Sequence, residues 1–281
     1  MKRLCILLMC TACVLLPFTG AVQAGVAEES EIRLGSVAMD IPAEMYRRLA
    51  PLTKYLSATL KRPVTLKLSA NMSAAIDEVS NGSVELAYLT PVAYIKAHAK
   101  GNVQLVAKML TNKKASFQLM VVVRDDSPIR RIQDLKGKSF AFGDKAAILQ
   151  RAVVVGAGMP LESLGEYKFI GHYDNIAKGV ANGDFDAGIL KDTMASDWKN
   201  RGLRILHSSA PLPPYNIVAS SKVDTKLLKQ IRQAFLSLNM KNPAHRAVIQ
   251  ALDGEYDGFA PARDADYDVV RRLIAPFEEK K

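Results

Sequence analysis

The chain has 281 residues, of which 49% are hydrophobic and 23% charged, and its formal net charge is +10. This composition is typical of a folded protein and argues against a disordered, collagenous or disulfide-rich chain. No long apolar stretch follows the N-terminal segment, which excludes a protein with many membrane spans. The basic residues form no dense run with interleaved aromatic residues, so nucleic-acid binding is not expected.

The N-terminal segment predicts export from the cell. Lys2 and Arg3 precede an apolar run over residues 4–18, and residues 22–24 offer small side chains where signal peptidase reads the chain. The pattern is typical of a secretory signal peptide, residues 1–24, cleaved after Ala24 to release a periplasmic protein. A membrane anchor and a lipid-modified cysteine are the alternatives. All three cysteines lie in this segment, so the exported chain should have neither disulfides nor thiolate metal sites.

Strand and helix patterns alternate through the first hundred residues. Strands are predicted at 32–37, 64–68 and 86–89, and helices from Pro42 to about Leu60, from Asn71 or Ser73 to about Ser80, and from Pro91. This alternation is typical of a parallel α/β sheet.

The middle of the chain predicts a second α/β unit. Two strand-like runs, 103–109 and 117–123, flank the polar residues 111–114, which we interpret as a crossing between lobes. Residues 211–214, three of which are prolines, cannot form regular structure and are the candidate return crossing. The elements predicted in order are a short helix 132–137, strand 140–142, helix 146–156, strand 167–170, helix 174–181, strand 186–190, a helix from Asp192, strand 203–206, strand 215–219 and a helix over 228–238.

One internal similarity supports two lobes. Residues 79–89 and 180–190 each contain a helix end, an Asn-Gly pair, an acidic residue and a strand. Asn-Gly suits the left-handed conformation that ends many helices. Two similar α/β lobes would produce this repeat, although chance is an alternative because such joints are common.

Two common catalytic motifs are absent from the sequence, and a secreted hydrolase, which would need a catalytic dyad in the cleft, is a further alternative. Neither Gly-x-Ser-x-Gly nor His-Glu-x-x-His occurs, and the four histidines are scattered without metal-ligand spacing. We therefore expect no enzymatic activity, no metal and no cofactor.

Several segments together resemble the phosphate/phosphite/phosphonate-binding proteins of bacterial ABC importers. The matching residues are 87–94, 134–144, 171–177, 183–188, 258–259 and 264–271. The resemblance implies an α/β, two-lobed type II periplasmic binding protein, each lobe a mostly parallel sheet flanked by helices, with the ligand cleft between them. We expect lobe 1 to comprise residues 25–112 plus 216–281 and lobe 2 to comprise residues 113–215.

The predicted cleft residues follow from this arrangement. Ligands of such folds lie at strand carboxyl ends and helix N-termini, where backbone N–H groups and the helix dipole favour anions. Thr90, Tyr94 and Tyr215 would donate hydroxyls or stack, Lys145 and Lys191 would supply charge, and Ala146 a backbone N–H. Each position has a helix-capping, core or solvent role as its alternative. The predicted ligand-binding residues are Met39, Thr90, Tyr94, Lys145, Ala146, Tyr173, Asp174, Lys191 and Tyr215.

One segment departs from the family pattern. Family members usually carry a Ser/Thr cluster after the Gly-Asp of the second lobe, whereas this chain has Lys145, Ala146 and Ala147 after Asp144. A hydrogen bond to a charged group contributes roughly 1.5–3 kcal/mol, so the loss of several donors changes ligand recognition and leaves the ligand's identity open.

The predicted function is that of a periplasmic substrate-binding protein of an ABC importer, which binds a small anionic, phosphonate- or phosphate-like solute. Its expected partners are the small-molecule ligand and an ABC permease in the inner membrane, and the chain is expected to be a monomer. The alternative is a periplasmic sensor or partner-binding protein of the same fold that signals to a membrane receptor.

Overall fold

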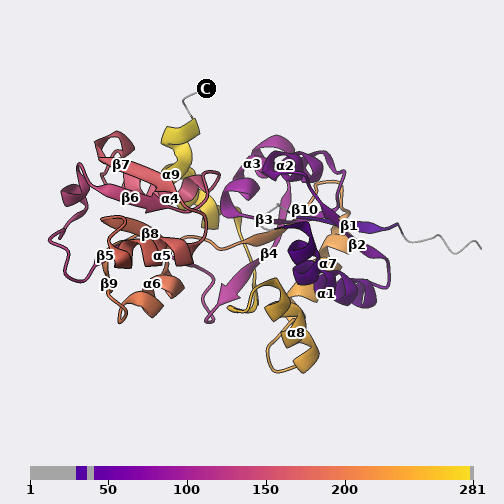
Figure 1. Ribbon diagram of the computed structural model, residues 1–281. Helices are drawn as coiled ribbons and strands as arrows, with labels where there is room; N and C mark the ends of the chain where they lie inside the picture. Colours follow the sequence, from indigo (N-terminus) through magenta and orange to yellow (C-terminus); the bar gives the residue numbers. More distant parts are fainter. Residues whose placement is uncertain (1–29, 37–40, 279–281) are drawn as a thin grey trace, which may run out of the picture.

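The computed structural model describes residues 30–36 and 41–278, so the predicted signal peptide and Met39 lie outside the described residues. Two β-sheets flanked by helices lie side by side (Figure 1). The strands are β1 (Ile32–Ser36), β2 (Val64–Leu68), β3 (Leu86–Leu89), β4 (Gln104–Thr111), β5 (Leu119–Arg124), β6 (Ser139–Phe142), β7 (Glu166–Phe169), β8 (Ala187–Lys191), β9 (Leu203–Ser208), β10 (Asn216–Ala219) and β11 (Tyr256–Ala260).

The helices alternate with strands over most of the chain. None of those within the described residues combines the length and apolarity that crossing a bilayer requires. They are α1 (Pro42–Leu60), α2 (Met72–Asn81), α3 (Pro91–Gly101), α4 (Ile148–Gly156), α5 (Tyr173–Asn182), α6 (Asp192–Trp198), α7 (Thr225–Ser237), α8 (Pro243–Leu252) and α9 (Asp268–Glu278).

Each sheet mixes parallel and antiparallel strands. The first has the order β11-β4-β10-β3-β1-β2 and the second the order β7-β6-β8-β5-β9. β1 is parallel to β2 and β3, and β6 to β7 and β8, whereas β10 and β5 run antiparallel to both of their neighbours. The two-lobed α/β fold is confirmed, but the sheets are mixed rather than mostly parallel. β5 and β10 are reached by direct crossings between sheets, and only a helical crossover imposes parallel pairing.

Capping residues place several helix ends where the sequence predicts them. Asn71 caps α2 by accepting a hydrogen bond from the N–H of Ala74 at 2.9 Å. Gly82 and Gly183 end α2 and α5 with φ of 76° and 83°, the left-handed conformation that glycine adopts without strain. β3 and β8 follow these two ends, so the two copies of the internal repeat occupy corresponding positions in the two sheets.

The C-terminal helix joins the two halves of the molecule. α9 follows β11 of the first sheet, yet it packs against α4 beside the second sheet and also contacts α3 (Figure 1). Val270 and Ile274 are its buried residues, and they belong to a continuous core that includes side chains of α3 and α4. At Gly156 of α4 an added Cβ would lie 2.8 Å from Leu273 Cδ2, so the two helices are in close contact.

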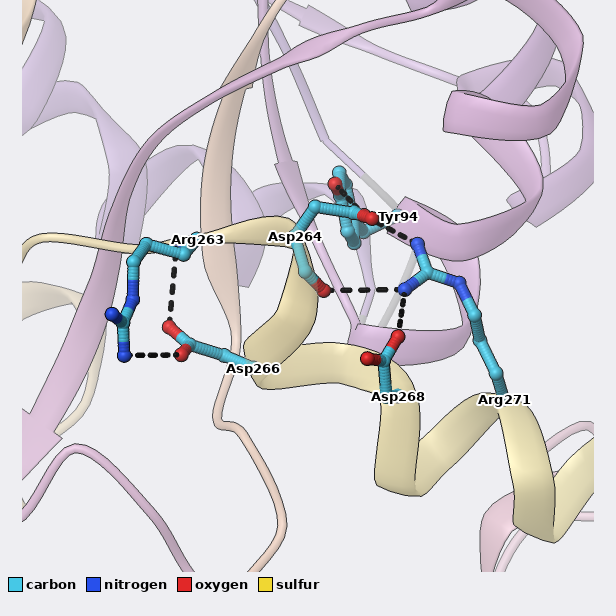
Figure 2. Close-up of polar contacts among 6 residues, drawn as sticks. All are labelled: Tyr94, Arg263, Asp264, Asp266, Asp268 and Arg271. Atoms are coloured by element: carbon cyan, nitrogen blue, oxygen red, sulfur yellow. Dashed lines mark hydrogen bonds and ion pairs between the residues drawn. The ribbon is translucent and has the colours of Figure 1, made fainter.

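The turn that leads into α9 is fixed by ionic contacts (Figure 2). Asp264 accepts a 2.6 Å hydrogen bond from the Tyr94 hydroxyl and also pairs with Arg271, whose Nη1 lies 2.7 Å from Asp268 Oδ1. Lys108 Nζ of β4 lies 2.8 Å from Asp266 Oδ2, and both side chains are largely buried. These contacts hold the start of α9 against α3 and β4.

The Lys108–Asp266 pair predicts a dependence of stability on pH. Burial raises the pKa of Asp266, but the hydrogen bond from Lys108 and the backbone N–H of Arg263 outweigh it, and the net pKa is lowered. A carboxyl with a lowered pKa stabilises the fold above its unfolded pKa, and this contribution is lost as the pH falls through the folded pKa. We expect Asp266→Asn to destabilise the protein near neutral pH and to reduce its loss of stability between about pH 5 and pH 3.

Urea unfolding of both proteins at several pH values measures this difference. Asp184→Asn, which removes an exposed carboxylate, is the control and should behave as the wild type does. Parallel stability curves for wild type and Asp266→Asn would contradict the prediction.

Candidate functional site

A cleft of about 630 Å³ opens between the two sheets and is lined by residues of both. The first sheet contributes the N-terminal half of α1, β3, the start of α3 and the segment between α8 and β11. The second contributes the starts of α4, α5 and α6 and the end of β8. Strand carboxyl ends and helix N-termini therefore converge on one space, as expected of an α/β ligand site.

Four helices begin at the cleft, namely α3, α4, α5 and the short α6. Thr90 caps α3, its hydroxyl oxygen accepting the N–H of Ala93 at 3.1 Å, whereas α4 and α5 have no side-chain cap. The N-terminus of a helix carries a partial positive charge and several N–H groups without helical partners. The starts of α3, α4 and α5 together favour negative charge in the cleft.

The loop before α4 is closed by its own side chains. Gln150 Oε1 accepts the N–H of Gly143 at 2.7 Å, and Asp144 Oδ1 accepts the N–H of Ala146 at 2.7 Å. Arg151 donates to the Lys145 carbonyl at 2.8 Å. This turn explains why α4 begins at Ile148, two residues later than predicted. The backbone N–H of Ala146, which was predicted to bind the ligand, is therefore already hydrogen-bonded to the Asp144 side chain.

Four tyrosines form much of the cleft wall. The Tyr88 and Tyr256 hydroxyls lie 3.0 Å apart, and the Tyr88 and Tyr215 ring centroids are 5.3 Å apart. Tyr173 adds a fourth hydroxyl from the second sheet. Burial raises the pKa of all four phenols, so they remain protonated and can donate hydrogen bonds.

An ion pair spans the cleft. Lys191, at the end of β8, pairs through Nζ with Glu255, which precedes β11 in the other sheet. The Lys191 side chain is about four-fifths buried, with a relative exposure of 21%. The main cation of the cleft is therefore held by a carboxylate of the same chain.

The structure brings some of the predicted residues together and separates others. Thr90, Ala146, Tyr173, Lys191 and Tyr215 line the cleft. Lys145 and Asp174 are exposed and are not among its lining residues. Met39 lies outside the described residues.

Tyr94 is displaced from the predicted site by its packing. It is 1% exposed, and its ring lies 4.5 Å from that of Tyr267 in the core. Its hydroxyl donates to Asp264, as Figure 2 shows. Tyr94 therefore anchors the turn before α9, the packing role that was its alternative in the sequence.

Several lining residues were not predicted from the sequence. Tyr88 lies within a buried strand, where alternation indicates only packing. Asp253 and Glu255 lie between α8 and β11, far along the chain from the other cleft residues. No local motif marks them, because only the pairing of β11 with β4 brings this segment to the cleft. Within residues 30–36 and 41–278, no cluster of His, Cys, Asp and Glu could hold a metal ion.

The fold defines a two-lobed periplasmic binding protein. XAC2383 from Xanthomonas citri, solved bound to chloride and also to ATP, is similar in structure: in its chloride form it is 20% identical with a TM-score of 0.73, over 89% of this chain and 98% of that one. PhnD1 from Prochlorococcus marinus (MIT 9301), solved in complex with methylphosphonate, is 18% identical with a TM-score of 0.71 over the same shares of the two chains.

Sequence comparison gives the family. Residues 34–267 match the family described as "ABC transporter, phosphonate, periplasmic substrate-binding protein". The Phosphate-import protein PhnD of Mycolicibacterium smegmatis is 23% identical, over 96% of this chain and 92% of that protein. The chain belongs to the periplasmic substrate-binding proteins of phosphonate ABC transporters. This is a family of binding proteins, which confirms the expectation of no enzymatic activity and favours the importer over the sensor interpretation.

Proposed function

We propose that the cleft binds a small anion of the phosphonate or phosphate class and that the chain delivers it to an ABC permease in the inner membrane. The observation that carries the proposal is the convergence of the starts of α3, α4 and α5, from two sheets, on one cleft that also contains Lys191. Helix N-termini bind phosphate and related anions without a dedicated motif. The protonated tyrosine hydroxyls add donors at the same place, although one hydroxyl of the Tyr88–Tyr256 pair donates to the other.

The relatives support the same class of ligand. One is named as a phosphate-import protein, and one was solved with methylphosphonate. The usual Ser/Thr cluster is replaced here by a loop in which side chains of the same segment accept the N–H groups of Gly143 and Ala146. We therefore assign recognition to the uncapped start of α5, the tyrosines and Lys191 rather than to the loop before α4.

Transport requires the two lobes to close on the ligand. We propose that residues 25–112 plus 216–281 and residues 113–215 move relative to each other about the two crossings, as a monomer. This division assigns α9 to lobe 1, although α9 packs on α4 of lobe 2. The contact between α9 and α4 must therefore be kept or broken when the lobes move. We also propose cleavage of the signal peptide after Ala24, which mass spectrometry of the exported protein would test by finding or not finding Gly25 at its N-terminus.

A thermal-shift screen of the mature chain from Gly25 tests the binding proposal. The panel comprises phosphate, phosphite, methylphosphonate, phosphonate monoesters, sulfate, alkanesulfonates, carboxylates, amines and sugars. A ligand at about 1,000 times its Kd adds about 4 kcal/mol and should raise the melting temperature by roughly 8–16 °C. We expect such a shift only with phosphorus oxyanions. A shift confined to amines, sugars or carboxylates, or no shift with any compound, would overturn the proposed function.

A further inference from the structure

The charges that line the cleft are poorly matched to a doubly charged anion. Among the described lining residues, the carboxylates Asp144, Asp253 and Glu255 outnumber the two permanent cations, Arg48 and Lys191. A phosphate or phosphonate dianion entering this space would meet more negative than positive side-chain charge. Among the described residues, the helix N-termini and the hydroxyls would have to offset the difference.

Both cations already have carboxylate partners. Lys191 pairs with Glu255 across the cleft, and Arg48 Nε lies 3.0 Å from Glu44 Oε1. A ligand anion must therefore share Lys191 with Glu255 or displace Glu255 into the cleft as a nearby negative charge. Either event disfavours the second charge of a dianion more than the first, because like charges a few ångströms apart repel strongly in a partly buried site.

Asp253 adds a carboxylate without a cation. Its Oδ1 accepts the N–H of Glu255 at 2.9 Å, and no ion pair joins it to any Lys, Arg or His among the described residues. The side chain is half-buried beside the tyrosines, and its charge contributes, after burial, to the raised pKa values of Tyr88, Tyr215 and Tyr256. This end of the cleft therefore opposes negative charge.

The cleft also offers room for an organic group. The cleft volume of about 630 Å³ lies within the range of sites that hold drug-sized molecules. Its apolar lining includes the partly exposed rings of Phe117 and Tyr215, which are backed by the buried side chains of Met45, Leu49 and Leu252. Such a surface is suited to an alkyl or aryl substituent and offers nothing specific to a bare oxyanion.

We propose that the cleft selects a singly charged phosphorus oxyanion that carries an organic substituent, namely a phosphonate monoester or a phosphate diester. The single charge lies at the start of α5, beside Lys191, and the substituent lies against the tyrosines and the apolar side chains of the cleft. Glu255 is the specificity-determining residue, because it holds Lys191 and penalises a second ligand charge. This inference rests on the proposed function.

Calorimetric titration with two matched probes tests the charge preference. Phenylphosphonate and its monomethyl ester share the aromatic group, but at about pH 8.5 the first carries two charges and the ester one. Both probes are compared at one pH, so the protein has the same charge state in the two titrations. We expect the ester to bind the wild-type protein about tenfold more tightly or better. Methylphosphonate, a small dianion at this pH, should bind more weakly than the ester.

Glu255→Gln tests the residue assigned to selectivity. It should tighten phenylphosphonate binding several-fold more than ester binding, and so reduce the preference for the ester. The matched control is Glu162→Gln, which removes an exposed carboxylate near the second sheet and should leave both affinities unchanged. The melting temperatures of both variants report their folding.

The outcomes separate the inference from the proposed function. Tighter binding of phenylphosphonate than of its ester, or an unchanged ratio in folded Glu255→Gln, would overturn the charge selection while leaving an anion-binding protein. Because Asp253→Asn retains the acceptor for the Glu255 N–H, it provides a second test, and it too should reduce the ratio. Binding of none of the three probes by the wild type would overturn the proposed function for organophosphonates, and the inference with it.

Discussion

Replacement of Lys191 by methionine is expected to lower the affinity for the tighter-binding phosphonate probe by about tenfold to a hundredfold. The ammonium is the permanent cation at the end of β8, and a hydrogen bond to a charged group contributes roughly 1.5–3 kcal/mol. The variant also leaves Glu255 facing the ligand without its partner, which adds repulsion. Methionine retains the length of the side chain, so the loss reports charge more than packing.

Calorimetric titration measures this effect against Lys226→Met, which removes an exposed ammonium on the outer side of α7 and should bind as the wild type does. The double variant Lys191→Met/Glu255→Gln should recover part of the lost affinity, because it removes the unpaired carboxylate. Unchanged affinity in Lys191→Met would remove Lys191 from the site, and equal losses in both lysine variants would indicate a general charge effect.

Replacement of Phe142 by alanine should be the most destabilising of the changes considered. Phe142 is the last residue of β6 and is fully buried, with its ring centroid 4.5 Å from that of Phe140 and 5.9 Å from that of Phe169. Truncation of such a residue removes its buried area and leaves a cavity, which costs about 3–5 kcal/mol. Since Gly143 and the loop before α4 follow directly, ligand affinity should fall as well.

Urea unfolding of the two proteins gives the free-energy difference. Tyr167→Ala is the comparison, because Tyr167 contacts the same cluster from β7 but is 40% exposed. We expect it to cost clearly less. A difference below about 1 kcal/mol for Phe142→Ala would mean that the cluster collapses around the deletion and that β6 does not depend on this ring.

Local sequence signals were sufficient for most of the architecture. Short apolar runs marked the buried strands, and the Asn-Gly pairs marked the ends of α2 and α5, because both features depend on nearby residues. The antiparallel placement of β5 and β10 could not be predicted in this way. It depends on how the chain crosses between the sheets, and a strand's own sequence does not record its direction relative to its neighbours.

The candidate site was most predictable where a strand leads directly into a helix, while Tyr215 was predicted from its place after the return crossing. Thr90 and Lys191 occupy such joints, and both line the cleft. Tyr94 lies one turn into α3, where the choice between the cleft and the core depends on packing with Tyr267. Asp253 and Glu255 reach the cleft through a pairing between distant strands. The excess of carboxylates over cations in the cleft therefore could not be predicted from the sequence and follows only from the structure.

Because α9 is the last helix of the described chain and packs on α4, the second half of the molecule can bury its core only after the C-terminal segment has folded. The second sheet is encoded entirely by residues that precede β10, yet one face of α4 is covered by the last eleven described residues of the chain. During synthesis and export, that face remains exposed to solvent until the C-terminus has emerged. Neither half can reach its final buried surface alone, so premature termination before Asp268 would leave an apolar surface on the half whose own sequence is intact.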